Sequence, residues 1–288
     1  MKRHTFFQFA APSMALMVLL MVVPLVVAIW LGMQFLTFRT MQDGPQWVGF
    51  ANYIDILGDP KFWQSFRFTA LYTFIVVPVR LVIGFVMALV LDQVSKGVRG
   101  VYLSIFLLPF IVVPIVGTLM FKQLFEASGL VAYFYREFLE TKFIYNEFNV
   151  KLLIVLHGIW YVTPYALVTY FAGLQTLPGD LLEAASIDGA SRWQKIRNIV
   201  IPHVSSLTIL ILLISIMDSY RIFDSVFVLT EGNPIYKAET VMTYTFQTAI
   251  RLERLGLGNA MSIVTVIGIM IVLIPNLYMS YKEQIEER

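Results

Sequence analysis

Long apolar runs separated by shorter polar segments dominate the pattern of this chain. Six runs reach the roughly 20 residues that a helix needs to cross a bilayer. They cover residues 10–36, 67–92, 102–121, 152–175, 204–229 and 258–281. Prolines recur inside them, and because neighbouring helices in lipid satisfy the carbonyl groups that proline frees, kinked helices are expected. The pattern predicts six transmembrane helices.

Composition agrees with this interpretation. Of the 288 residues, 58% are hydrophobic and only 14% are charged, whereas soluble domains average about 45–50% and about 25%. A soluble monomer would have too few polar groups to cover so much apolar surface. The expected fold is therefore an all-α polytopic membrane protein, with residues 1–288 forming one transmembrane domain.

Charge and cysteine content exclude several classes of function. The net charge is only +2, so the chain lacks a basic surface for nucleic acid. Cysteine is absent, which excludes disulfides, thiol catalysis and cysteine-ligated metals. The three histidines are scattered, so no metal site is expected.

Basic residues indicate how the chain lies in the membrane. The first apolar run is longer than the roughly 7–15 residues of a signal-peptide core, so it is expected to be a retained span. With a cytoplasmic N-terminus, the inner segments are the two tails and the 93–101 and 176–203 loops. Their basic residues are Lys2, Arg3, Lys96, Arg99, Arg192, Lys195, Arg197, Lys282 and Arg288. The outer loops hold about as many basic residues, but these are spread over longer segments. The higher density of positive charge in the inner segments therefore favours cytoplasmic N- and C-termini.

One outer segment has a helical pattern of its own. Residues 126–149 carry Tyr133, Phe134, Tyr135 and Phe138. Tyrosine is enriched where membranes meet water, so this segment is expected to lie at the membrane surface.

The 176–203 loop differs from the rest of the chain. Pro178 and Asp180 are expected to open a first short helix, as a first-turn proline and a capping carboxylate do. Gly189 then breaks the helix, Ser191 caps a second one, and Pro202 ends it. The loop is therefore predicted to form two short helices that project from the bilayer.

The second helix of this loop is amphipathic. Trp193, Ile196 and Val200 fall at i, i+3 and i+7 and form one apolar stripe beside basic residues. Such a stripe suits docking into a groove of a partner protein. An amphipathic helix pair resting on lipid headgroups explains the same composition, so both interpretations stay open.

The loop resembles the EAA loop of binding-protein-dependent ABC importer permeases. The resemblance rests on Glu183-Ala184-Ala185, on Ile187-Asp188-Gly189-Ala190 and on the closing Ile201-Pro202. It is closest to the carbohydrate branch, where Phe usually stands at Ile196 and Leu at Ile201; both differences keep an apolar residue. In that family the loop is the coupling helix that sits in a cleft of the ATPase subunit. The residues implied in ATPase coupling are Glu183, Ala184, Ala185, Asp188, Gly189, Ala190, Trp193, Ile196 and Pro202.

Other segments extend the resemblance over nearly the whole chain. Ala11-Pro12, the run from Val48 to Tyr53 and the run from Asp59 to Trp63 are similar to the first permease of a sugar-transport pair. Residues 229–234 resemble the Thr-x-Gly-Gly-Pro turn of that branch, with Asn233 at the second glycine; asparagine tolerates positive φ well. The resemblance implies a type I ABC importer permease architecture in a bacterial inner membrane.

Ionisable residues occur in the fifth span. Asp218, Arg221 and Asp224 form an i, i+3, i+6 series whose members can pair on neighbouring turns. Each costs about 2.5–3.5 kcal/mol at the bilayer centre, so none is expected to face lipid. They either line the translocation pathway or hold the helix through ion pairs. Because a Phe-Asp pair is usual in the resembled family, Phe223-Asp224 favours a structural role for Asp224.

Two other spans carry residues of interest. Arg80 in the second span is expected to contact a neighbouring helix rather than mark a cavity. In the fourth span, Trp160 and Tyr161 follow His157 at i+3 and i+4 and offer aromatic faces on which a sugar ring can stack. Packing between helices is the favoured role for both, and a sugar path is the alternative.

No phosphate-binding loop, nucleophile elbow or zinc-binding helix motif occurs, so the chain is expected to be non-catalytic and to bind no cofactor. The resemblance implies an ATP-driven importer subunit for a sugar or sugar derivative. The implied partners are a second permease, two ATPase subunits that bind ATP and Mg, and a periplasmic or lipid-anchored binding protein. The alternative is an ion- or proton-coupled secondary transporter that uses Asp218, Arg221 and Asp224 as a relay.

Overall fold

The computed structural model describes residues 3–126, 128–141 and 143–286. Lys2 and Arg288 lie outside the described residues. Within them, six helical segments are long and apolar enough to cross a membrane, which confirms the predicted number and order of spans. These segments are Phe9–Gly32, Pro60–Gln93, Pro114–Phe138, Glu147–Leu174, Ser205–Thr230 and Leu255–Tyr278.

The contacts divide the chain into two compact units. The first comprises Met1–Gln64 and Val241–Gly268, and the second comprises Ser65–Thr240 and Ile269–Arg288. The first unit contains α1 (Arg3–Gly32), α2 (Thr40–Asp43), α3 (Ala51–Gly58), α14 (Val241–Phe246), a π-helical turn (Gln247–Arg251) and the start of α15 (Leu255–Glu286). It also holds a two-stranded antiparallel hairpin, β1 (Gln34–Phe35) and β2 (Gln46–Trp47), with Gln34 opposite Trp47.

Asn52 determines where the first span ends. Its side-chain nitrogen donates to the carbonyl oxygens of Gly32 and Gln34, at 2.9 Å in each case. These bonds hold the chain in the hairpin just after α1, so the helix stops at Gly32 and not at residue 36 as predicted. A buried amide of this kind satisfies carbonyl groups that the helix end leaves unpaired.

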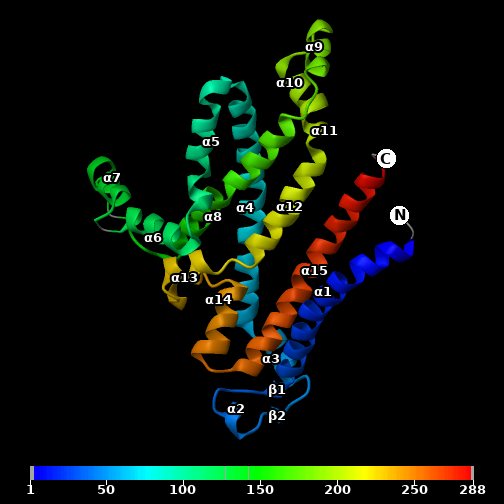
Figure 1. The fold of residues 1–288 in the computed structure, drawn as a ribbon. Coiled ribbons are helices and arrows are strands. Elements are labelled where there is room, and N and C mark those ends of the chain that lie inside the picture. The colour runs from blue at the N-terminus through cyan, green and yellow to red at the C-terminus, as the bar shows by residue number, and fades with distance from the viewer. Residues whose placement is uncertain (1–2, 127, 142, 287–288) are drawn as a thin grey trace. The chain divides into compact units, whose positions relative to one another are not determined.

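The second unit is a helical bundle (Figure 1). Its long helices are α4 (Pro60–Gln93, shared with the first unit), α5 (Lys96–Ile111), α6 (Pro114–Phe125), α8 (Glu147–Leu174) and α12 (Ser205–Tyr220). Shorter elements are α7 (Leu130–Leu139), α9 (Gly179–Ile187), α10 (Arg192–Lys195), a π-helical turn (Ile196–Val200), α11 (Ile201–His203), α13 (Asp224–Thr230) and a 3-10 turn (Pro234–Tyr236). One core packs around Leu167 and Ile211, and another around Val76, Ile154 and Val226.

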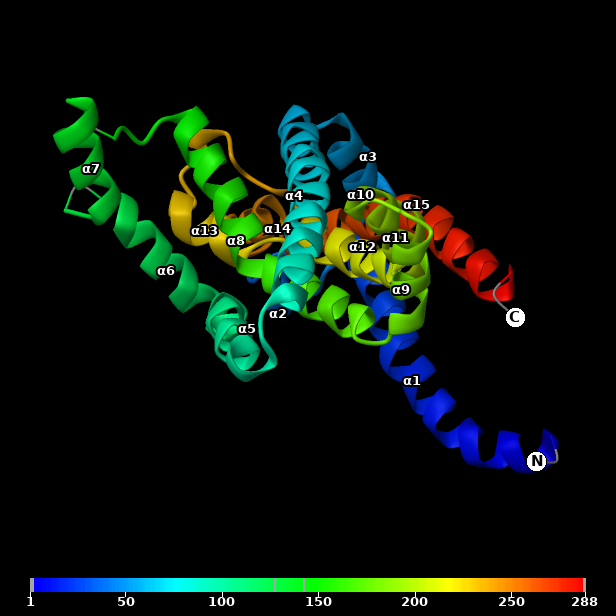
Figure 2. The same ribbon diagram turned by 90° about the horizontal axis from the view of Figure 1, so that it is seen from above.

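The third predicted span, 102–121, is not one helix. α5 ends at Ile111, Val112 and Val113 are extended, and α6 starts at Pro114. Proline has no N–H group and pushes the preceding residue out of the helical region, so the break falls immediately before Pro114. Seen from above, α5, α6 and α7 follow one another along one side of α8 (Figure 2). The helix expected within 126–149 is confirmed as α7.

The fifth span is broken as well. α12 ends at Tyr220, and α13 begins at Asp224 after three residues without helical structure. The carbonyl group of Ile222, freed by the break, accepts a hydrogen bond from the Thr240 hydroxyl at 2.9 Å. Irregular backbone at membrane depth requires such partners, because lipid supplies none.

Candidate functional site

The 176–203 loop projects from one end of the second unit. Figure 1 shows α9 and α10 at the end where α4 turns into α5, and α13 at the opposite end of α12. Gly189 has φ +80°, a left-handed conformation that reverses the chain between the two helices, as predicted. The Ser191 hydroxyl accepts from the Gln194 N–H at 3.3 Å, and Gln194 Oε1 accepts from the Ser191 N–H at 2.7 Å. This capping box confirms Ser191 as the cap of the second helix.

Two details of the predicted loop are wrong. Pro178 lies before the first turn of α9, and Asp180 lies within that turn without making a capping hydrogen bond. Pro202 does not end the second helix, because helical structure runs from α10 through the π-helical turn into α11 and changes only at Val204. In the π-helical turn the Ile201 N–H donates to the Ile196 carbonyl. This wider turn accommodates Pro202, which a regular α-helix would exclude.

The tip of the loop exposes apolar side chains. Ile187 is 87% exposed and Trp193 is 66% exposed. Glu183, Ala184, Asp188, Gly189 and Pro202 are exposed as well, while Ala185, Ala190 and Ile196 are half-buried. Val200, at the other end of the predicted stripe, is buried in the core around Leu167. The apolar stripe therefore runs from the exposed tip of the loop into the core of the bundle.

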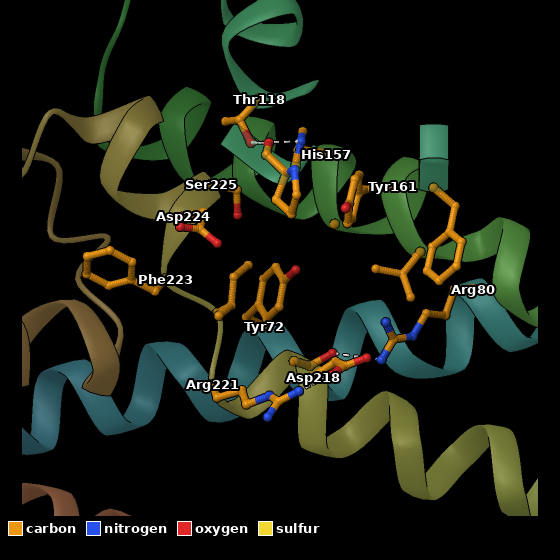
Figure 3. A pocket seen from close by; sticks show the side chains of 16 residues that line it. Tyr72, Arg80, Thr118, His157, Tyr161, Asp218, Arg221, Phe223, Asp224 and Ser225 are labelled. Atoms are coloured by element: carbon orange, nitrogen blue, oxygen red, sulfur yellow. Dashed lines mark hydrogen bonds and ion pairs between the residues drawn. The ribbon is translucent and has the colours of Figure 1, made fainter. Parts of the chain in front are cut away.

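A pocket of about 300 Å³ lies between α4, α6, α8 and the break in the fifth span (Figure 3). Four of the five residues predicted along a substrate path line it: Tyr161, Asp218, Arg221 and Asp224. Trp160 does not. Its ring stacks on Phe121 with centroids 5.8 Å apart, and it lines a separate apolar pocket with Ile83 and Pro164.

Arg80 anchors the end of α12 at this pocket. Its side chain is buried, and Nη2 donates to the Ser219 hydroxyl at 2.9 Å and to the Ser215 carbonyl. The predicted contact with a neighbouring helix is therefore confirmed, although Arg80 also lines the cavity.

The predicted ionic series forms only in part. Arg221 Nη2 lies 3.1 Å from Asp218 Oδ1, and the Arg221 side chain is 67% exposed. Asp224 lies beyond the helix break, in the first turn of α13, and among the described residues no ion pair joins it to Arg221. The break removes the regular spacing on which pairing along the series depended. A carboxylate at a helix N-terminus is favourable without an ion pair.

Aromatic and hydroxyl groups complete the pocket wall. His157 Nε2 lies 3.2 Å from the Thr118 hydroxyl of α6, and the imidazole stacks on the Tyr161 ring at 5.7 Å. Tyr161 in turn donates to the Val112 carbonyl at 3.3 Å, where the chain leaves α5. Sequence reasoning did not find Tyr72, Thr118, Ser219 and Ser225, which also line the pocket. The hydroxyl groups of these residues, inside apolar spans, were the signal that could have indicated the pocket. Hydroxyl groups are common in transmembrane helices, where they also bond to the helix's own backbone, so they do not single out a pocket.

Comparison with known proteins identifies the family. Residues 80–284 match the family described as the inner membrane component of binding-protein-dependent transport systems. The chain belongs to this family. It is 30% identical over 233 residues to the inner membrane ABC transporter permease protein YcjO of Escherichia coli, covering 79% of this chain and 78% of that protein. The trehalose transport system permease protein of Mycobacterium tuberculosis is 28% identical over 267 residues, with 91% and 84% covered.

A third relative and a solved structure agree. The trehalose/maltose transport system permease protein of Thermococcus litoralis is 29% identical over 258 residues, with 88% of this chain and 86% of that protein covered. A subunit of a bacterial ABC transporter that imports the polysaccharide alginate superposes with a TM-score of 0.80 at 18% identity, covering 96% and 95% of the two chains. This likeness confirms the predicted ABC importer permease fold. The chain is a multi-pass inner membrane protein, and the secondary-transporter alternative is not supported.

Proposed function

We propose that this chain is one half of the membrane channel of an ATP-driven importer for a sugar or sugar derivative. The exposed tip of the 176–203 loop carries the proposal. Ile187 and Trp193 are large apolar side chains, 87% and 66% exposed, on helices that project away from the bundle. Apolar side chains that protrude beside charged ones suit a groove in a partner protein. That partner is proposed to be an ATPase subunit, with ATP and Mg bound there.

The solute is proposed to pass through the pocket between α4, α8 and the broken fifth span. Two arginines, Arg80 and Arg221, and two aspartates, Asp218 and Asp224, line it, so the formal charges balance and favour a neutral solute. Arginine and carboxylate groups hydrogen-bond to hydroxyl groups, and the Tyr161 ring offers a face for a sugar ring. The names of the trehalose and trehalose/maltose permeases support the same class of solute.

The remaining partners and the orientation are proposed because they fit the family. A second permease subunit would complete the channel, and a solute-binding protein would deliver the solute to the outer loops. The 93–101 and 176–203 loops and both termini would then face the cytoplasm. Closure of two ATPases would push the Glu183–Pro202 segment and shift a two-state bundle from inward-open to outward-open.

Cross-linking tests the coupling role directly. Because the native chain has no cysteine, Ile187→Cys introduces a single thiol at the loop tip. We expect it to cross-link to a cysteine in the groove of the co-purified ATPase subunit, while Phe138→Cys, an exposed site on α7, serves as the matched control and does not. A tip thiol that is labelled only from the outside of intact cells would overturn the proposal.

Uptake tests the energy source and the solute. In proteoliposomes that contain the complex and its binding protein, radiolabelled trehalose or maltose is expected to enter only with ATP inside. Glu183→Lys and Gly189→Asp should abolish uptake while ATP hydrolysis and membrane insertion continue. Uptake driven by an ion gradient without ATP would contradict the proposal.

A further inference from the structure

A closed ring of polar side chains lies where the 176–203 loop leaves α8. Arg99 Nη1 donates to Gln175 Oε1 at 3.1 Å, and Gln175 Nε2 donates to Asp92 Oδ1 at 2.8 Å. Arg99 and Asp92 close the ring with an ion pair of 3.6 Å. Asp92 lies near the end of α4, Arg99 lies in the first turn of α5, and Gln175 caps α8. The ring therefore ties the α4–α5 turn to the residue that immediately precedes the loop.

Arg99 makes more contacts than the ring requires. Its Nη2 also donates to the carbonyl oxygens of Asp92 and Val94, at 2.5 and 3.2 Å. The guanidinium group lies over the Phe171 ring, 5.3 Å from its centroid, and the side chain is only 16% exposed. A planar group with five donors can hold these partners at once, whereas a lysine ammonium group cannot.

The loop is tied at its other end as well. The Thr176 hydroxyl lies 3.1 Å from His203 Nε2, which also lies 3.2 Å from the Gly173 carbonyl. The points where the chain enters and leaves the loop are thus joined to each other. Arg99 bonds to Gln175, the residue before Thr176, and so links this junction to the α4–α5 turn. A displacement of the loop reaches α8 and α12 through the covalent chain. Through the polar contacts at Gln175 it also reaches α4 and α5.

We infer that Arg99 is a positioning residue for coupling: it makes the α4–α5 turn move with the 176–203 loop. The inference rests on the proposed function, because it assumes that an ATPase moves the loop. Without Arg99, α4 and α5 would follow only through apolar packing and the single Gln175–Asp92 hydrogen bond, which yield more readily to sliding than a closed ring of directional bonds.

A pair of spin labels tests this movement. Gly97→Cys, on the α4–α5 side, and Gly179→Cys, at the start of α9, both place a side chain in open space. In the complex with its ATPase subunits, we expect the distance distribution between these labels to be the same with and without ATP. With Arg99→Ala, the distribution should shift or broaden on ATP addition. Lys96→Ala, which removes an exposed positive charge from the same turn, should behave as the native chain does.

Transport coupling supplies a second readout. We expect Arg99→Ala to lower the number of trehalose molecules imported per ATP several-fold, with Arg99→Lys only partly restoring it. Gln175→Ala should have the same effect, and the double variant should be no worse, because both changes open one ring. A merely structural loss would reduce the amount of complex but leave the ratio unchanged.

The outcomes separate this inference from the proposed function. If the Ile187→Cys thiol cross-links to the ATPase but the Arg99→Ala labels keep one distance with and without ATP, this inference is wrong and the proposed function stands. If that thiol does not reach the ATPase, the proposed function fails, and the inference falls with it.

Discussion

Arg80 on α4 and Ser219 on α12 are joined by a hydrogen bond of 2.9 Å, one residue before α12 ends. Arg80 also donates to the Ser215 carbonyl one turn earlier. Together these bonds hold the last turn of α12 against α4, next to the break that shapes the pocket. Arg80 thus acts as a support for the pocket wall as well as part of its lining.

Removing one or both of these hydrogen bonds should destabilise the bundle, and more so when both are lost. We expect Ser219→Ala to lower the free energy of unfolding by about 0.5–1.5 kcal/mol, the usual value of one hydrogen bond. Arg80→Ala loses both bonds and leaves a cavity, so about 2–4 kcal/mol is expected. Thermal unfolding in detergent, followed by circular dichroism, measures both. Ser104→Ala, an exposed serine on α5, is the control, and equal melting temperatures for Arg80→Ala and the native chain would contradict this account.

Gly158 and Tyr72 make a second close contact between α8 and α4. A Cβ atom at Gly158 would lie 2.0 Å from the Tyr72 hydroxyl oxygen and 2.8 Å from the ring carbon that bears it. Gly158→Ala should therefore cost about 1–3 kcal/mol of stability, as overpacking does. Adding Tyr72→Phe should restore part of the loss, because it removes the nearer atom only. Gly100→Ala, which meets no atom within 4 Å, is the control, and a double variant no better than Gly158→Ala would refute the contact.

The turn at Gly189 offers a test that involves no packing. No atom lies within 4 Å of a Cβ placed there, but φ is +80°, so Gly189→Ala costs about 1–2 kcal/mol through the backbone alone. We expect it to lower the ratio of uptake to ATP hydrolysis. Gly189→Asn should be milder, because asparagine adopts this conformation more readily.

Gly179→Ala is the matched control for this turn. Its Cβ also meets open space, and Gly179 does not have a positive φ. If Gly189→Ala and Gly179→Ala give the same ratio of uptake to ATP hydrolysis, this account of the turn is wrong.

The ion pair between Lys122 of α6 and Glu231, which follows α13, predicts a pH dependence. The hydrogen bond from the Lys122 ammonium group lowers the pKa of the Glu231 carboxyl below its ordinary value of 4.5. A carboxyl with a lower pKa in the folded state stabilises that state above its unfolded pKa, and the contribution is lost as the pH falls through the folded pKa.

The melting temperature of the native chain should therefore exceed that of Glu231→Gln at about pH 7, and the gap should close toward about pH 3. The effect should be small, since the Glu231 side chain is 75% exposed. Glu140→Gln is the control, because Glu140 is also exposed and also has a positive φ. A gap that is independent of pH would mean that the ion pair is not its source.

The loop could be predicted closely because its signals are local. The reversal at Gly189 and the cap at Ser191 depend on single residues and their immediate neighbours. Pro202 was misjudged because a π-helical turn six residues earlier in the chain, at Ile196, accommodates it, and such turns have no clear pattern in the sequence. The breaks after Ile111 and Tyr220 were missed because hydropathy does not change where the helix stops.

The pocket could be predicted only in part. Tyr161 and Trp160 are neighbours in the sequence with similar side chains, yet they face different cavities. Successive residues on a helix point about 100° apart, so one cavity cannot take both. Which of the two faces the polar pocket depends on how α8 packs against α4 and α6.

The amino-acid sequence by itself determined that the chain crosses a membrane six times and carries a two-helix loop between its fourth and fifth spans. Both follow from the transfer of local segments between water and lipid and from the conformations open to single residues. Only the tertiary structure brought Arg80, Thr118, His157 and Ser219 around one pocket, and Asp92, Arg99 and Gln175 into one ring. Apart from Asp92 and Arg99, which flank one turn, these groups lie tens of residues apart, and the contacts between helices that unite them are decided by side-chain packing over the whole bundle.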